Sequence, residues 1–166
     1  MKKLQQHHYG FQNFLKNQNI KKIILKDLVD GVASDLKEKI HIRSVRDLLV
    51  YSYRVAGTVG LMMSKILMVN DRRALKGAID LGIAMQLTNI ARDVNEDKRH
   101  QRQYIKPDFH SIKKTVNESE IFYQKSFNSI SSIPLRSRFS VILARRVYKK
   151  IGDYILKQKN TKNYNK

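Results

Sequence analysis

The amino-acid sequence predicts an all-α protein, and three observations lead to that fold class. Only two prolines, Pro107 and Pro134, interrupt the 166 residues. Few stretches alternate with the two-residue period of a half-buried strand, whereas apolar residues recur with the three- and four-residue spacing of helices. The length and the 42% share of hydrophobic residues suffice for one hydrophobic core but not for two domains.

Apolar periodicity and capping residues predict helices along most of the chain. Asp47 is the expected cap of the third helix, which is almost wholly apolar from Leu48 onward and is therefore expected at the centre of the fold. The turn at Asn70 and Asp71 opens the fourth helix, and Pro134 separates the last two. The predicted helices span residues 11–15, 23–36, 47–68, 73–100, 118–130 and 135–157.

The sequence contains no internal repeat and no linker, so we expect a single domain over residues 1–166. Its core is expected over about residues 11–157, and the Lys- and Asn-rich tail over residues 158–166 is expected to fray. The last helix carries one apolar stripe that should face inward: Val141, Ala144, Tyr148, Ile151 and Ile155.

The charge and the composition restrict the classes of function. The chain has no cysteine, which excludes disulfides, thiolate metal sites and a cysteine nucleophile. Its formal net charge of +19 attracts polyanions such as nucleic acid, anionic lipid or diphosphate esters. Basic residues are spread over every segment rather than gathered with aromatic residues, which disfavours nucleic acid. With neither a membrane-spanning stretch nor a signal peptide, we expect a cytoplasmic protein, with peripheral contact to the anionic inner face of the membrane as a further reading of the charge.

The fourth helix carries the most informative pattern of polar residues. At 100° per residue, its polar members fall with one glycine within a stripe of about 80°. Apolar residues flank the first half of this stripe, so we expect it to face the protein interior. The stripe consists of Gly82, Gln86, Asn89, Asp93 and Asp97.

Two carboxylates at positions i and i+4 suggest a divalent cation between them. Asp93 and Asp97 should lie about 5–6 Å apart at Cβ, where they repel unless a cation intervenes. Mg²⁺ prefers one or two carboxylates, waters and the oxygens of a bound phosphate, and Asn89 offers a further oxygen. The alternative, which stays open at this point, is a solvated carboxylate pair neutralised by nearby basic residues: Arg92, Lys98, Arg99 and Arg102.

The third helix contains two glycines, Gly57 and Gly60, inside an apolar segment. Each costs about 1 kcal/mol relative to alanine, so something should compensate. Close helix packing is the favoured explanation. The alternative is a kink or a bare wall along a tunnel for a long hydrocarbon.

These stretches resemble a known family. Residues 51–63 and 80–97 are similar to the two most recognisable segments of the squalene/phytoene synthase family, and the similarity is closest to bacterial phytoene synthases. Residues 27–35 and 133–152 resemble further helices of that family, so the resemblance covers about residues 11–157. It implies a partial isoprenoid-synthase helical bundle, the C-terminal portion of the family's fold.

The resemblance also implies an activity and a set of site residues. The family joins two prenyl diphosphates head to head with the help of Mg²⁺, and phytoene synthases use two geranylgeranyl diphosphates in carotenoid biosynthesis. By resemblance, Asn89, Asp93 and Asp97 hold Mg²⁺, and the two aspartates are the catalytic pair. The residues expected to approach the substrate are Gln86 and Arg92 at the diphosphate, the tyrosines Tyr51 and Tyr148, and Val55, Ala56, Val59 and Gly60 along the prenyl tunnel.

One departure from the family pattern bears on activity. The family's first Asp-x-x-x-Asp motif has no counterpart in the chain, since Asp27, Asp30 and Asp35 have other spacings and match a later helix. We therefore expect a chain that is inactive alone, either a fragment or a subunit that takes the first motif from a partner chain. A non-catalytic assembly or scaffold protein is the alternative from another class.

Overall fold

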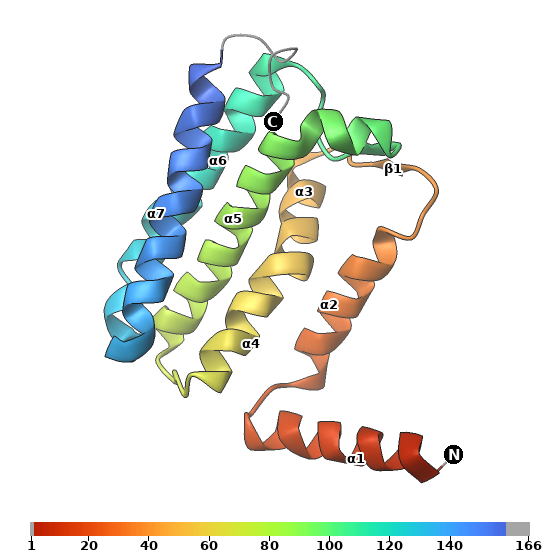
Figure 1. Cartoon of the computed structure of the whole chain (residues 1–166), viewed down its shortest axis with the longest axis vertical. Helices are drawn as coiled ribbons and strands as arrows, with labels where there is room; N and C mark the ends of the chain where they lie inside the picture. Colours follow the sequence, from red (N-terminus) through yellow and green to blue (C-terminus); the bar gives the residue numbers. More distant parts are fainter. Residues whose placement is uncertain (1, 159–166) are drawn as a thin grey trace.

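The structure, a computed structural model, describes residues 2–158 and is almost entirely helical (Figure 1). The predicted all-α class is confirmed. The helices are α1 (Lys2–Asn17), α2 (Lys22–Ser34), α3 (Val45–Ser52), α4 (Thr58–Ile66), α5 (Arg72–Arg99), α6 (Phe109–Phe127) and α7 (Leu135–Lys157), with a π-helical turn η1 (Tyr53–Gly57) and a 3₁₀ turn η2 (Ile130–Ser132). Two short segments that the sequence did not predict, β1 (Ile40–His41) and β2 (Arg102–Gln103), pair in parallel.

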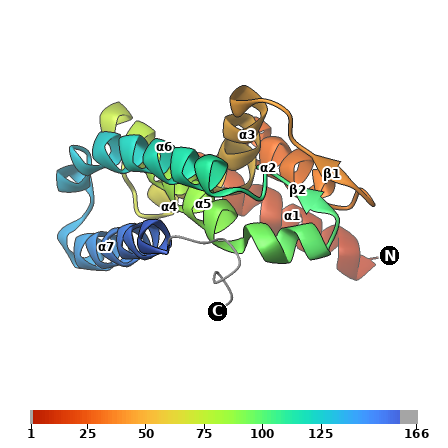
Figure 2. The ribbon, with the colours of Figure 1, turned by 90° about the horizontal axis from the view of Figure 1, so that it is seen from above.

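Helix α5 lies at the centre of the fold. It packs against α6, α4, η1 and α7, and Figures 1 and 2 show it between these elements. Ala84, Leu87 and Ala91 of α5 have no exposed surface at all. The helix predicted over residues 47–68 is present as the unbroken helical run of α3, η1 and α4 over residues 45–66, but the expectation that it is central is wrong, because it leaves Met63 54% exposed.

Side-chain caps explain where the helices begin. Ser44, not Asp47, caps α3: its hydroxyl accepts the Asp47 backbone N–H at 3.1 Å and donates to the Asp47 carboxylate at 2.7 Å. Asp71 caps α5 by accepting the backbone N–H of Arg73. Asp108 caps α6 in the same manner at Ser111, so α6 begins nine residues before the predicted residue 118.

The ends of the chain differ in how well they match expectation. Helix α7 has the predicted bounds, and Ile155 of its predicted inward stripe is buried. Helix α1 extends well beyond the predicted residues 11–15. Gln158 is the C-cap of α7, and the rest of the expected tail lies outside the described residues.

Three glycines allow η1 and α4 to approach α5 closely. A Cβ atom at Gly60 would overlap the Ala78 carbonyl oxygen of α5, and one at Gly82 would overlap the Ala56 carbonyl oxygen of η1. A Cβ at Gly57 would lie 3.2 Å from the Ile79 side chain. Close packing, the favoured reading of the glycines at positions 57 and 60, is therefore confirmed.

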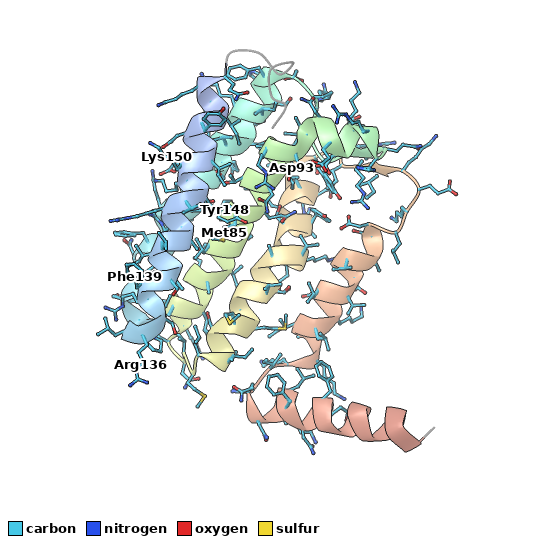
Figure 3. The ribbon with its side chains drawn as sticks, viewed as in Figure 1. Met85, Asp93, Arg136, Phe139, Tyr148 and Lys150 are labelled. Carbon is cyan, nitrogen blue, oxygen red and sulfur yellow. The ribbon has the colours of Figure 1, made fainter. Side chains whose placement is uncertain are left out.

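Apolar side chains also lie on the surface. Helix α7 exposes a second apolar face, and Figure 3 labels Phe139 on it. No helix within residues 2–158 is long and apolar enough to cross a membrane. The exposed apolar residues of α7 are Leu135, Phe139, Leu143, Val147 and Tyr154.

The glycine contacts predict the effect of an added methyl group. Gly82→Ala should lower the free energy of unfolding by about 1–3 kcal/mol, because the methyl group would push η1 away from α5. Gly10→Ala is the matched control, since a Cβ there meets nothing within 4 Å; it should leave stability unchanged or raise it slightly. Urea unfolding followed by circular dichroism measures both, and equal losses would contradict the packing argument.

Candidate functional site

The predicted polar stripe lies on α5 and is partly buried. Gln86, Asn89, Asp93 and Asp97 all retain intermediate exposure. The side-chain oxygen Oδ1 of Asn89 is buried and has no hydrogen-bond partner among the described residues. A buried amide oxygen without a partner is costly, so this atom is a candidate ligand for a cation or a donor that the chain itself does not supply.

Arg92 neutralises one of the two aspartates. Its guanidinium donates two hydrogen bonds to the neighbouring Asp93 carboxylate, from Nε at 2.8 Å and from an Nη at 2.6 Å. Both side chains are partly exposed, at 40% and 26%. This ion pair is what the alternative of a solvated, neutralised carboxylate pair predicts. It also places a guanidinium beside the carboxylate, where the guanidinium can bind an anion.

The second aspartate lies in an environment that disfavours its charge. Burial and then the neighbouring charge of Asp93 raise the pKa of Asp97 to about 6, although Arg102 counteracts part of this. Glu96 and Asp35 add smaller repulsions in the same direction. A cation at this position would relieve the repulsion, so the electrostatics favour binding of positive charge here.

A hydrogen-bonded cluster lies at the same end of α5. Both carboxylate oxygens of Asp35 accept tyrosine hydroxyls, one from Tyr51 and one from Tyr104, each at 2.9 Å. The two rings stack with centroids 4.8 Å apart. The charge of Asp97 contributes to the raised pKa of Tyr104, about 12, so the cluster lies within electrostatic reach of the stripe.

The sequence argument identified Tyr51 as a site residue but missed Asp35 and Tyr104. Asp35 lies in a segment that resembles the family, but its spacing to other aspartates matches no metal-binding motif. Tyr104 follows β2 and carries no motif of its own. Their partners are 16 and 69 positions away in the chain, so only the folded structure joins them.

A groove of about 870 Å³ runs between the C-terminal half of α5 and α7. Arg92 and Asp93 line it on α5, and Figure 3 shows Asp93 and Lys150 at this end of the two helices. Polar and charged groups therefore share the groove with an apolar wall from α7. That wall consists of Val147, Ile151 and Tyr154.

The other predicted residues do not line that groove, and neither do Gln86, Asn89 and Asp97 of the stripe. Val55 and Ala56 belong to η1 and are partly buried, while Val59 on α4 is 43% exposed. Gly60 packs on the α5 backbone, and Tyr148 of α7 is partly buried. Their roles along a prenyl chain stay predictions.

The donor set on α5 fits a hard divalent cation. Two carboxylates and an amide oxygen on one helix face are oxygen ligands of the type that Mg²⁺ binds while keeping waters or phosphate oxygens. In the part of the chain that the structure describes, no three His, Cys, Asp or Glu side chains gather closely enough to hold a metal. Two carboxylates and one amide oxygen leave coordination positions of such a cation for waters or for the oxygens of a bound ligand.

Comparisons with known proteins identify the family of the chain. A sequence model of the family described as squalene/phytoene synthase matches residues 4–108. The 15-cis-phytoene synthase of Paracoccus sp. is 36% identical over 144 residues, 76% of this chain and 47% of that protein. The 15-cis-phytoene synthase of Pantoea ananas is 33% identical over 164 residues, 86% of this chain and 53% of that protein. The chain therefore spans about half the length of these relatives.

A solved structure shares the fold. Squalene synthase HpnC from Alicyclobacillus acidocaldarius superposes with a TM-score of 0.76 at 17% sequence identity, covering 89% of this chain and 64% of that one. At this identity the likeness shows the fold alone, which is that of the all-α isoprenoid synthases.

The raised pKa of Asp97 predicts how stability depends on pH. The folded state holds the Asp97 proton more tightly than the unfolded chain does. The stability that this group contributes to the folded protein is therefore lost as pH rises from about 4 to about 6. Asp97→Asn, which cannot ionise, should therefore gain about 1 kcal/mol over the wild type between pH 4.5 and 7.5, after allowance for solvent screening. Urea unfolding in the presence of a chelator measures this, with Asp153→Asn on the exposed side of α7 as the charge-matched control. An equal change in both variants would contradict it.

Proposed function

Because the chain belongs to the squalene/phytoene synthase family, we propose that it forms the diphosphate-binding part of an enzyme that joins two prenyl diphosphates head to head. Geranylgeranyl diphosphate is the favoured substrate, since the curated relatives compared above are 15-cis-phytoene synthases. The observation that carries the proposal is the buried, unpartnered Oδ1 of Asn89 on the same face of α5 as the two aspartates.

In this proposal Asn89, Asp93 and Asp97 hold Mg²⁺. When bound, the ion supplies positive charge that neutralises the diphosphate as the carbon–oxygen bond to the prenyl group breaks. The repulsion between the two aspartates and the raised pKa of Asp97 support a cation at this position.

Arg92 is proposed to bind the diphosphate directly. Its guanidinium already forms a two-pronged contact with Asp93, and a diphosphate oxygen pair accepts the same geometry. The groove beside it is lined by charged groups, including Arg99 and Lys150, and by an apolar wall on α7, which suits an anionic head with a hydrocarbon tail. Gln86, Tyr51 and Tyr148 are proposed to contact the substrate, and Val55, Ala56, Val59 and Gly60 to line the prenyl tunnel.

A second polypeptide segment is proposed to complete the site. The chain spans about half of its relatives, and its described part offers one pair of aspartates on α5. Stabilising a departing diphosphate calls for cations on both of its sides, and one helix anchors only part of that charge. We propose that the other aspartate motif comes from a partner chain or a further segment, and that residues 1–166 alone turn over slowly or not at all.

The exposed apolar faces favour a second candidate function, a non-catalytic assembly or scaffold protein. Phe139 is 73% exposed and Tyr154 is 63% exposed on one helix, which suits contact with another protein. This function does not need Asp93 or Asp97, so loss of either would leave protein binding unchanged.

Titration calorimetry tests the metal-dependent site. Geranylgeranyl diphosphate should bind the 166-residue chain more tightly with Mg²⁺ than with a chelator, and Asp93→Ala should remove at least about tenfold of this Mg²⁺-dependent gain. The gain, rather than the total affinity, is compared because the substitution also frees Arg92 from Asp93. Asp153→Ala is the control for loss of one negative charge, and an unchanged gain in Asp93→Ala would favour the scaffold.

An activity assay tests the need for a second segment. With Mg²⁺ and geranylgeranyl diphosphate, the purified 166-residue chain should form little or no head-to-head product, because half of the charge that stabilises the leaving group is missing. Product analysis by liquid chromatography measures this. Turnover at an ordinary enzyme rate, near 10 s⁻¹ or roughly within tenfold of it, would overturn the expectation.

A further inference from the structure

The Asp35 carboxylate connects three segments that lie far apart in the chain. It follows the last turn of α2, Tyr51 lies on α3, and Tyr104 follows β2. Each of its oxygens accepts one hydroxyl at 2.9 Å, and the two hydroxyl oxygens are 3.2 Å from each other. The stacked rings hold both phenols in this arrangement.

The chemistry of the cluster determines where the hydroxyl protons point. A carboxylate accepts hydrogen bonds and cannot donate them, so both phenols direct their protons toward Asp35. The Tyr51 oxygen then presents lone pairs to its other neighbours. Burial, reinforced by Tyr104 and by the charge of Asp35, raises the pKa of Tyr51, so the phenol stays neutral under ordinary conditions.

A second contact on the same helices provides a comparison. Tyr53, two residues after Tyr51, donates its hydroxyl to Asp27 of α2 at 3.2 Å. Both tyrosines therefore join η1 and α3 to α2 through an aspartate. Only the Asp35 contact includes a second tyrosine and lies near Asp97, whose charge acts on Tyr104.

We propose that Asp35 is a positioning residue: by accepting the protons of Tyr51 and Tyr104 on its two carboxylate oxygens, it leaves the lone pairs of the Tyr51 oxygen free to accept a hydrogen bond from a water on the Mg²⁺–diphosphate complex. This inference rests on the proposed function, because Tyr51 is taken to contact the prenyl diphosphate. Asp35 itself touches no substrate; it acts through Tyr51. The Asp27 contact joins α2 to Tyr53, which is not among the residues proposed to contact the substrate.

The test compares binding of geranylgeranyl diphosphate with Mg²⁺ across variants of the 166-residue chain. Asp35→Asn and Tyr51→Phe should each weaken binding about tenfold, and the double variant should match either single one within about twofold. Asp35→Glu, which keeps a carboxylate, should recover part of the loss. Asp27→Asn is the matched control and should change affinity less than about twofold, since it removes the Tyr53 contact alone.

Two results would overturn the proposal. Additive losses in the double variant would mean that Asp35 does not act through Tyr51. If Asp27→Asn lost as much affinity as Asp35→Asn, both aspartates would act only by holding α2 in place. Urea midpoints identify any variant that fails to fold. If Asp35→Asn does not fold, Asp35→Glu is compared with Tyr51→Phe instead.

A spectroscopic readout separates this inference from the proposed function. The ¹³Cζ signal of Tyr51, assigned from the spectrum of Tyr51→Phe, reports the hydrogen bond of its hydroxyl. It should shift in Asp35→Asn and stay in place in Asp27→Asn, whether or not the chain binds a prenyl diphosphate. If the wild type binds none, the proposed function fails; if the signal is unmoved in Asp35→Asn, the positioning role fails.

Discussion

The backbone of α5 approaches the backbones of η1 and α4 so closely that no side chain fits between them. Gly60 lies against Ala78, and Gly82 lies against Ala56, each with a carbonyl oxygen where a Cβ would be. These two contacts determine the rotation of α5 about its axis. Gly82, the first residue of the polar stripe, therefore faces η1, and Tyr51 of α3 joins Asp35 and Tyr104, on which the charge of Asp97 acts.

Charge compensation at that end is local and incomplete. Arg92 balances Asp93 within one residue, and two tyrosine hydroxyls donate to Asp35, whereas at Asp97 the charge of Arg102 offsets only part of the effect of burial and of neighbouring carboxylates. The net charge of +19 does not remove this imbalance, because most basic residues are solvated and screened beyond about 10 Å. In the proposed function, a metal ion with a diphosphate would supply a cation beside Asp97 and an anion for Arg92.

The elements that the sequence predicted well are those whose pattern is local and repeated. Helix α7 has the predicted bounds, and α5 begins and ends within one residue of expectation, because Asp71 caps it and its periodicity is long. Helix α6 is longer than predicted because Asp108 caps it well before residue 118. The division at η1 was missed, since a π-helical turn depends on how residues 53–57 pack against α5 and leaves no separate mark in composition.

The sequence by itself determined the helical class, the family and the alignment of Gln86, Asn89, Asp93 and Asp97 on one helix face, because helical geometry converts spacing into direction. Only the tertiary structure decided which side of that helix is buried, that Oδ1 of Asn89 lies without a partner, and that Asp35 and Tyr104 join Tyr51. The physical reason is that burial and hydrogen bonding between distant segments depend on how the helices pack, and packing depends on contacts such as those of Gly60 and Gly82, whose effect a linear pattern does not contain.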